Sequence, residues 1–256
     1  MSLFRGTIRS ELLQLDTGLT VILPYDYPTT VRQEPCPVVY VLHGLGGNHE
    51  CWTRYSNIER YARQYGAAIV MPDVWRSFCS NMQYGRPMFD YITQELPSVI
   101  GAMFRISQKR EDTFIAGQSM GGYGCLKCAF TCPEQYAAAG AISGVADFKL
   151  RFPVDFEDTV RAPDMQHIFG KEPVMEPNDD LFVLAERVAQ LPEAARPRIY
   201  ACCGEQDPLR EYNLNLTTHM KTLPLEYTYQ EWEGVHTWPF FDEAMKRVLA
   251  FFFENR

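Results

Sequence analysis

The chain has 256 residues, a length that fits one large α/β domain or two smaller ones. Hydrophobic residues make up 46% and charged residues 22%, which is typical of a globular protein with a substantial core. The formal net charge of −8 argues against nucleic acid or an anionic membrane as the main partner. The amino-terminal residues show no secretory signal, and no apolar run approaches the roughly 20 residues of a membrane span. We therefore expect a cytoplasmic protein.

Two segments at the amino terminus, "LFRGTIRSELLQL" and "TGLTVILP", predict an antiparallel strand pair joined at Asp16-Thr17-Gly18. Beyond this pair, strand-like and helix-like segments alternate. Strands are predicted over residues 37–44, 67–73, 112–117, 137–144, 198–204 and 225–232. Helices are predicted over residues 52–65, 90–106 (kinked at Pro97), 119–132, 181–190, 212–223 and 239–253.

Near-continuous apolar strands that alternate with helices indicate a mostly parallel sheet with helices on both faces. The alternation stops over residues 145–191, a segment rich in Pro, Asp and Phe that we call the excursion. Its short helix is expected to begin at a cap provided by Asn178, Asp179 or Asp180. Without repeats or linkers, the chain is expected to form one domain, residues 1–256, with the excursion inserted in it.

Eight cysteines do not form a disulfide framework in a chain with this much core, so we expect reduced thiols. Cys125, Cys128 and Cys132 have the spacing of one helix face, which is compatible with a metal or redox cluster or with a buried stripe of small residues. No nearby Cys-His pair supplies a fourth ligand. The spacing therefore favours core packing, and we expect no metal or other cofactor.

The stretch "TFIAGQSMGGYG" places Ser119 in a G-x-S-x-G motif, between a predicted buried strand and a helix. In that context a serine occupies a tight, strained turn, and its hydroxyl projects beyond the carboxyl end of the strand. The amino terminus of the following helix brings a partial positive charge to the same place. The motif predicts an exposed nucleophile.

A serine hydroxyl needs a base to remove its proton, and histidine is the usual one. The chain has five histidines, at positions 43, 49, 167, 219 and 236. In this type of sheet the order is serine, acid, histidine, so only His219 and His236 come late enough. His236 lies in a loop directly after a strand, whereas His219 lies inside a predicted helix, so His236 is the better candidate.

The acid is expected in the loop after the strand at residues 198–204, where "GEQDPL" offers Glu205 and Asp207. Asp207 lies deeper in the loop, from which a side chain can turn toward the histidine loop, hold the imidazole tautomer and stabilise the imidazolium. Glu205, Asp147 and Asp242 remain as alternatives.

Acyl transfer also requires hydrogen-bond donors for the oxyanion. The "HGLGG" stretch, His43–Gly47, closes the first predicted parallel strand. We expect the backbone N–H of Leu45 to act with that of Met120. A phosphate-binding loop is the alternative, but no G-K-[ST] sequence follows.

With these motifs in place, the chain resembles the esterase D-type α/β-hydrolases, and within them the tributyrin esterase group of bacterial short-chain carboxylesterases. The matching words are "VLHGLGGNHECW", "MQYG", "KREDTFIAGQSMGGYGCLK", "CGEQD" and "GVHTW". The resemblance implies an α/β-hydrolase fold, a triad of Ser119, Asp207 and His236, and the excursion as a lid. It also implies Leu45 and Met120 as oxyanion donors.

Three positions depart from the pattern of the family. Gly46 stands where a serine is more common, Pro208 follows the acid where an aromatic is common, and Gly47 stands where the related S-formylglutathione hydrolases usually carry cysteine. The third departure disfavours a glutathione thioester as substrate.

We therefore expect a serine carboxylesterase for short acyl esters. The resemblance implies acyl groups from acetyl to butyryl, and it also makes acetylated carbohydrate a candidate substrate. The partner is a small-molecule ester, and homo-oligomerisation is left open. Trp52, Tyr84 and Trp238 are candidates for substrate binding, although large aromatics are more often part of the core. Thioester hydrolysis or acyl transfer on the same triad, and a binding protein without activity, are the alternatives.

Overall fold

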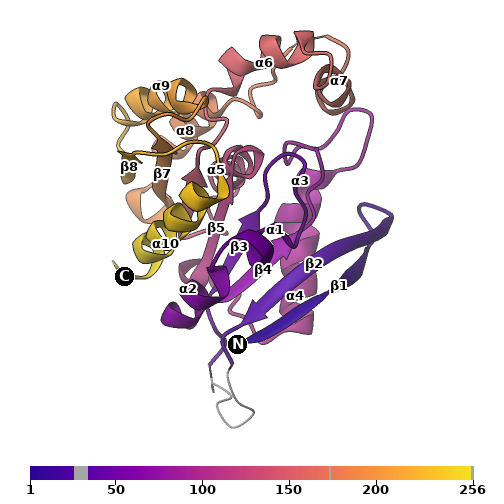
Figure 1. Ribbon diagram of the computed structural model, residues 1–256, viewed down its shortest axis with the longest axis vertical. Coiled ribbons are helices and arrows are strands. Elements are labelled where there is room, and N and C mark those ends of the chain that lie inside the picture. The colour runs from indigo at the N-terminus through magenta and orange to yellow at the C-terminus, as the bar shows by residue number, and fades with distance from the viewer. Residues whose placement is uncertain (26–33, 173, 255–256) are drawn as a thin grey trace.

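The computed structural model describes residues 1–25, 34–172 and 174–254. Within these residues, eight strands form one sheet in the order β1-β2-β4-β3-β5-β6-β7-β8, with helices around it (Figure 1). The strands are β1 (Ser2–Ser10), β2 (Leu15–Leu23), β3 (Val38–Leu42), β4 (Ala68–Pro72), β5 (Thr113–Gln118), β6 (Ala138–Ile142), β7 (Arg198–Gly204) and β8 (Tyr227–Trp232). The chain has the α/β-hydrolase fold, as expected.

Strand β2 runs antiparallel to both β1 and β4, and every other neighbouring pair in the sheet is parallel. The first turn differs from our prediction, because the chain reverses over residues 11–14 and Asp16-Thr17-Gly18 lies in β2. Gly18 is needed for close packing instead of a turn. A Cβ there would lie 2.3 Å from side-chain atoms of both His49 and Asp73.

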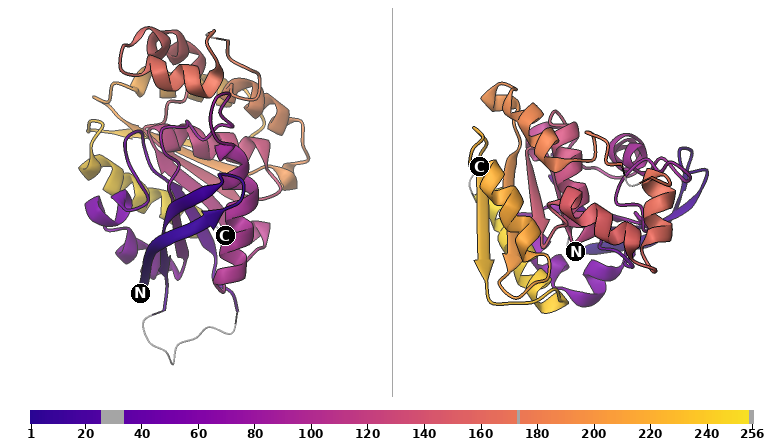
Figure 2. Two further views of the ribbon diagram at one scale, coloured as in Figure 1. Left: turned by 90° about the vertical axis from the view of Figure 1, so that its right-hand side faces the viewer. Right: turned by 90° about the horizontal axis from the view of Figure 1, so that it is seen from above.

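The two faces of the sheet carry separate apolar clusters, and β3 contributes alternately to both. Val39 and Val41 face the cluster under α1 (Cys51–Tyr55), α2 (Ile58–Tyr65) and α10 (Trp238–Glu254). The intervening residues of β3 face the cluster under α4 (Leu96–Met103), α5 (Met120–Thr131), α8 (Leu181–Ala189) and α9 (Arg210–Met220). Figure 2 shows helices on both sides of the twisted sheet. This two-sided burial explains the continuous apolar strands in the sequence.

Two predicted helices are interrupted. The segment 52–65 divides into α1 and α2 at Ser56, whose backbone is extended. The segment 90–106 consists of α3 (Met88–Asp90), a π-helical turn at Tyr91–Glu95 and α4. Pro97 lies in the first turn of α4, where its missing N–H removes a helical hydrogen bond, so the predicted irregularity falls just before it.

The excursion contains more regular structure than we predicted. Besides α8 it forms α6 (Phe148–Glu157) and α7 (Ala162–Phe169), which lie beyond the carboxyl ends of the strands, at the top of Figure 1. Pro153 lies inside α6, and such prolines concealed the helical pattern. Of the three expected caps of α8, Asp180 is the one used, because its side chain accepts a hydrogen bond from Phe182 N at 2.9 Å.

Cys125 and Cys128 face the core from α5, and Cys132 is only partly buried at the end of that helix. Burial raises the pKa of the Cys125 and Cys128 thiols well above the ordinary value and that of Cys132 to about 11. Across residues 1–25, 34–172 and 174–254, no helix has both the length and the apolar character needed to cross a bilayer.

Candidate active site

Four loops converge at the carboxyl edge of the parallel strands. They follow β3, β5, β7 and β8, which run in the same direction through the sheet. Because parallel strands end at a common edge, the loops bring together residues that are far apart in the sequence. They carry the glycine-rich stretch 43–47, Ser119, Asp207 and His236.

Ser119 occupies a strained turn between β5 and α5, with φ 55° and ψ −118°. A non-glycine residue adopts such angles only where its surroundings enforce them, and such strain is concentrated at functional sites. Glycines at 117 and 121 make the turn possible. A Cβ at Gly121 would lie 2.3 Å from the Leu42 carbonyl oxygen, and one at Gly117 would lie 2.4 Å from the Gly121 carbonyl oxygen. Positions 117 and 121 are therefore glycine because β3, β5 and α5 cross too closely there to leave room for a side chain.

Asp207 and His236 are in direct contact: His236 Nδ1 lies 2.8 Å from Asp207 Oδ2. The Asp207 side chain is fully buried and also accepts a hydrogen bond from Leu209 N at 2.8 Å. Burial by itself raises the pKa of this carboxyl group, but the hydrogen bonds from His236 and Leu209 outweigh it, so the pKa lies below its ordinary value. Asp207 is thus a carboxylate, and His236 donates to it through Nδ1, which leaves Nε2 as the acceptor nitrogen of the ring.

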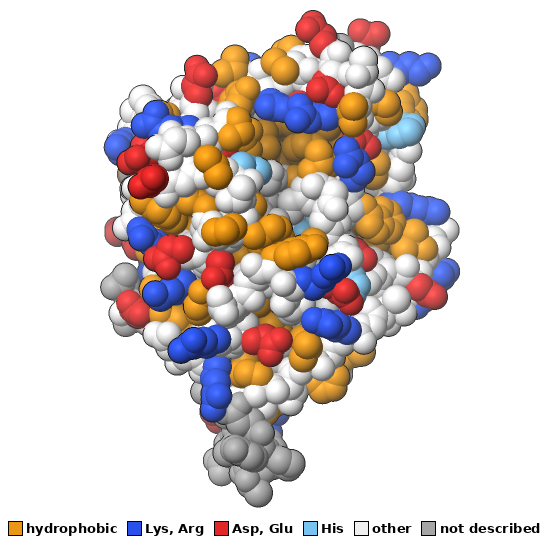
Figure 3. All heavy atoms as spheres, viewed as in Figure 1, with side chains coloured by type: hydrophobic (Ala, Val, Ile, Leu, Met, Phe, Trp, Pro, Cys, Tyr) orange, Lys and Arg blue, Asp and Glu red, His pale blue; other side chains and the backbone are white. Residues whose placement is uncertain are grey.

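Ser119 and His236 line the same two cavities. The smaller, of about 220 Å³, lies against the excursion and is bordered also by Leu45 and Met120. The larger, of about 440 Å³, extends over the 44–47 loop toward Trp238. Figure 3 shows a hollow in the upper half of this face, with apolar side chains on its floor and basic side chains at its edge. A substrate with two parts could therefore bind on both sides of the serine.

Three of the other candidates for base and acid are engaged by other partners. His219 Nε2, on α9, lies 3.5 Å from Glu186 Oε1. Asp147 caps α6 by accepting from Leu150 N at 3.0 Å. Asp242, on α10, accepts hydrogen bonds from Asn57 and Tyr61. Glu205 is exposed in the loop that buries Asp207.

The glycine-rich loop after β3 packs directly on the serine turn. A Cβ at Gly44 would lie 3.2 Å from Ser119 Cβ. The loop is a tight turn in which Gly47 N donates to Gly44 O at 3.0 Å, and Gly46 has a φ of 79°, a value that favours glycine. The N–H of Met120 belongs to the first turn of α5, where no helical carbonyl can accept it.

His43 connects this loop to the loop after β4 through hydrogen bonds of its ring. The ring is buried, its Nδ1 lies 2.8 Å from Gly44 O, and its Nε2 accepts from Val74 N at 2.9 Å. Burial lowers the pKa of His43, which keeps the ring neutral. Both ring nitrogens are occupied by backbone groups, so His43 positions the loop and is not available as a base.

The three aromatic candidates for substrate binding have different positions. Trp238 borders the larger cavity. Trp52 is only 1% exposed and packs edge-on against Trp238 with ring centroids 5.2 Å apart, so it supports the cavity from the core and does not line it. Tyr84 is 58% exposed and borders neither cavity. The interpretation of Trp52 and Tyr84 as substrate-binding residues is not supported by these positions.

Sequence reasoning missed three charged residues of the excursion that border the smaller cavity, Arg151, Asp155 and Arg161. The i, i+4 spacing of Arg151 and Asp155 was the available signal, because such pairs lie on one helix face. Pro153 interrupts the helical pattern in this segment, so the sequence predicts no helix there. The larger cavity also includes Tyr55 and Phe241, each three positions beyond a quoted motif and in neither motif.

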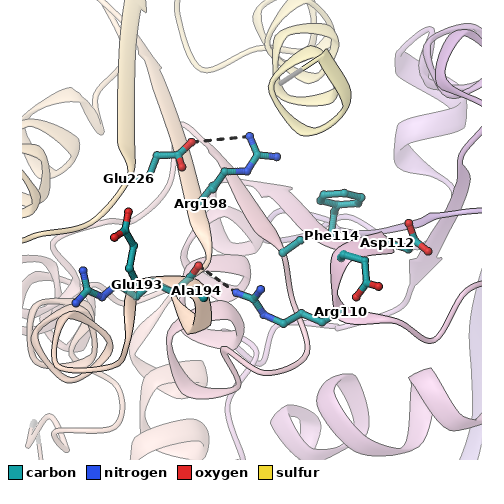
Figure 4. Close-up of a pocket in the computed structure, with 10 residues that line it drawn as sticks. Arg110, Asp112, Phe114, Glu193, Ala194, Arg198 and Glu226 are labelled. Atoms are coloured by element: carbon teal, nitrogen blue, oxygen red, sulfur yellow. Dashed lines mark hydrogen bonds and ion pairs between the residues drawn. The ribbon is translucent and has the colours of Figure 1, made fainter. Parts of the chain in front are cut away.

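A cavity of about 520 Å³ lies at the opposite end of the sheet, where β5, β7 and β8 begin. Its arginines hold the ends of neighbouring elements. Arg110 donates to Arg196 O at 3.0 Å, and Arg198 donates to the last turn of α10 and pairs with Glu226 at 3.9 Å (Figure 4). These bonds explain the cluster as a structural one, remote from Ser119.

The chain is similar to known esterases in sequence and in fold. The model of the Esterase family, described as "Putative esterase", matches residues 10–252. An acetyl esterase of Caldicellulosiruptor saccharolyticus is 27% identical over 259 residues, which cover 97% of each chain. An S-formylglutathione hydrolase of Paracoccus denitrificans is 28% identical over 152 residues, 51% of this chain and 54% of that one.

Two solved structures from Staphylococcus aureus are each 30% identical to this chain and cover 98% of both chains. One is the fluorophosphonate-binding serine hydrolase FphF with substrate bound, with a TM-score of 0.89. The other is the S-formylglutathione hydrolase FrmB as apoenzyme, with a TM-score of 0.85.

Fold and site together define an α/β-hydrolase with a serine at the strand-to-helix turn. The chain belongs to the Esterase family, and it is a carboxylic ester hydrolase of the serine esterase or thioesterase kind.

Proposed function

We propose that the protein is a serine carboxylesterase that hydrolyses short-chain acyl esters through an acyl-enzyme on Ser119. His236 acts as the base and Asp207 orients it. One observation carries this proposal: the imidazole that is fixed at 2.8 Å by a buried carboxylate lines the same cavities as a serine in a strained turn.

In the acylation step, Ser119 Oγ attacks the ester carbonyl carbon while His236 Nε2 takes the hydroxyl proton. The carboxylate of Asp207 holds Nδ1–H and stabilises the imidazolium without accepting its proton. The tetrahedral intermediate then expels the alcohol, which leaves with the proton from Nε2. Water attacks the acyl-enzyme by the same route, and the acid is released with Ser119 restored.

The oxyanion of both tetrahedral intermediates is stabilised by the backbone N–H groups of Leu45 and Met120. Both residues border the smaller cavity together with Ser119. The tight 44–47 turn and the neutral His43 ring beneath it hold the first donor in place before substrate arrives. Donors that are fixed in advance cost no reorganisation during the reaction.

The size of the smaller cavity, about 220 Å³, supports a short group beside the serine, because it is less than the 300–1,000 Å³ typical of sites for drug-sized ligands. The acetyl esterase relative and the resemblance to tributyrin esterases support short acyl groups. The excursion acts as a lid, because α6 and α7 bring three side chains to the cavity wall.

Thioester hydrolysis is the second candidate, since two relatives with this fold are S-formylglutathione hydrolases. Gly47 disfavours it as the main activity, because the related S-formylglutathione hydrolases usually carry cysteine at this position. A side chain at Gly47 would start 3.2 Å from Cys51 Sγ and 3.1 Å from Gly44 O, so the loop leaves little room for one.

A substrate panel tests the proposal. The values of kcat/KM for p-nitrophenyl acetate, butyrate, octanoate and decanoate are compared with those for S-formylglutathione. We expect acetyl and butyryl esters to be turned over fastest. Faster turnover of S-formylglutathione than of every oxygen ester would replace this proposal by the thioesterase.

A further inference from the structure

Two arginines and one aspartate of the excursion form part of the wall of the smaller cavity. Arg151 and Asp155 lie one turn apart on α6, and Arg161 lies immediately before α7. All three border the cavity that also contains Ser119 and His236. Catalysis as described above uses none of them.

The three charges are organised around a single oxygen atom. Asp155 Oδ1 accepts from Arg151 Nε at 2.8 Å and from Arg161 Nη1 at 3.0 Å. The Asp155 side chain is 3% exposed, Arg151 is 16% exposed and Arg161 is 37% exposed. One buried carboxylate therefore holds two guanidinium groups in adjacent positions at the cavity wall.

Neighbouring elements hold this cluster in place. Asp147 caps α6 and also accepts from Asn215 of α9 at 3.0 Å. Arg76, in the loop after β4, binds Asp164 of α7 through Nε at 2.8 Å. Helix α6, which carries Arg151, and helix α7, which Arg161 directly precedes, are thus each tied to the body of the domain.

The charge of the cavity wall is unbalanced. Among the described residues that line it, two cations and one anion leave a formal surplus of one positive charge, in a chain whose net charge is −8. Asp158 lies 3.6 Å from Arg161 but is 36% exposed and does not border the cavity, so solvent weakens its effect there. Burying part of a guanidinium is costly unless an anion approaches it, and a planar carboxylate fits the guanidinium fork.

We infer that the natural substrate is an ester that carries a carboxylate, which binds to Arg151 and Arg161 while its ester group lies at Ser119. This inference rests on the proposed function, because it assigns the substrate class of the same site. A single negative charge matches the surplus of one, which favours a monoanionic carboxylate over a doubly charged phosphate. The carboxylate belongs to either the acyl or the alcohol part of the ester.

Two matched pairs of esters distinguish these sources. Monoethyl adipate and its neutral amide, ethyl adipamate, place the charge on the acyl part. The acetyl esters of 4-hydroxybenzoate and 4-hydroxybenzamide place it on the alcohol part. We expect kcat/KM to be about tenfold higher for the anionic member of one pair, the effect of one charge-assisted hydrogen bond, and the preference to weaken in 0.5 M NaCl.

The variants Arg161→Gln and Arg151→Gln are each expected to abolish most of this preference, and Arg161→Lys to retain part of it. Arg187→Gln is the control. Arg187 is an exposed arginine on α8 of the same excursion that binds Asn178 at 2.7 Å and borders neither cavity. Because Arg161 is partly exposed, its substitution is expected to leave the fold intact, which circular dichroism checks.

Equilibrium binding of the four esters to Ser119→Ala protein separates this inference from the proposed function. Tighter binding of an anionic ester that is lost in the Ser119→Ala, Arg161→Gln double variant supports the inference, whether or not the wild type turns the ester over. Equal binding within both pairs, or a preference that survives both arginine substitutions, overturns it. Absence of turnover of every neutral and anionic ester, with the binding preference intact, would instead contradict the esterase proposal.

Discussion

The imidazole of His236 and the carboxylate of Asp207 lie in different loops, 29 positions apart in the chain, yet His236 Nδ1 and Asp207 Oδ2 are separated by only 2.8 Å. The loops follow β7 and β8, which are adjacent and parallel, so their carboxyl ends are adjacent as well. The sheet therefore sets the distance between the proposed acid and the proposed base.

Substitution of Asp207 by asparagine is expected to lower kcat by up to about 10⁴, because the amide no longer selects the histidine tautomer with a free Nε2 acceptor. Initial rates with p-nitrophenyl butyrate provide the measurement. Glu205→Gln is the matched control, since Glu205 lies two positions earlier and is exposed. Full activity of the Asp207→Asn variant would show that another group orients the base.

Asp207 should also leave a signature in the pH dependence of stability. Its pKa in the folded protein lies below the ordinary carboxyl value of 3.8, so the carboxylate stabilises the fold above that pH, and this contribution is lost as the pH falls through the folded-state pKa. Urea unfolding at pH 6 and pH 3 measures the effect. The difference in free energy of unfolding between wild type and Asp207→Asn should shrink at pH 3, and a constant difference would contradict the lowered pKa.

Gly121→Ala tests the crossing beneath the nucleophile. The new Cβ would lie 2.3 Å from the Leu42 carbonyl oxygen, so the backbone must move, at a cost of about 1–3 kcal/mol in the free energy of unfolding. Activity should fall too, because the movement would separate α5, which follows Ser119, from β3, which precedes the 44–47 loop.

Gly6→Ala is the control for this substitution, since a Cβ at Gly6 has no atom within 4 Å among the described residues. We expect a change within about 0.5 kcal/mol at that position. Equal effects of the two substitutions in urea unfolding would mean that the crossing tolerates a side chain.

The thiols provide a test of the core assignment. Cys51 and Cys132 are partly exposed, whereas Cys125 and Cys128 are buried and their pKa values are raised by that burial. In native protein at pH 8, iodoacetamide should modify Cys51 first and leave Cys125 and Cys128 intact until urea is added. Mass spectrometry of the peptides identifies the sites, and rapid native modification of Cys125 or Cys128 would indicate a reactive cluster instead.

Much of the fold could be predicted from the sequence because its strands are buried on both faces. Continuous apolar runs such as 198–204 identify the parallel strands directly, and the structure has β7 at those residues. The first turn could not be read the same way. Asp16-Thr17-Gly18 has turn composition, but the glycine is required by the side chains of His49 and Asp73, which no local pattern reveals.

The candidate site, like the fold, could be predicted from the sequence only in part. Ser119 and His236 are marked by local sequence, a glycine-rich turn and a loop after a strand, and the structure brings both to the same cavities. Arg151, Asp155 and Arg161 reach the cavity only through the tertiary placement of α6 and α7, whose helical pattern is obscured by Pro153 and Pro163. Trp52 was misleading for the opposite reason, since adjacency to the glycine-rich loop in sequence did not place it in a cavity.

Under the proposed function, His236 makes Ser119 nucleophilic. Reaction with a fluorophosphonate probe, followed by mass spectrometry of the labelled peptide, tests it most directly. We expect one adduct, on Ser119, with labelling abolished in Ser119→Ala and slowed at least about a hundredfold in His236→Gln. Labelling of a different residue, or an unchanged rate in His236→Gln, would mean that His236 does not activate Ser119.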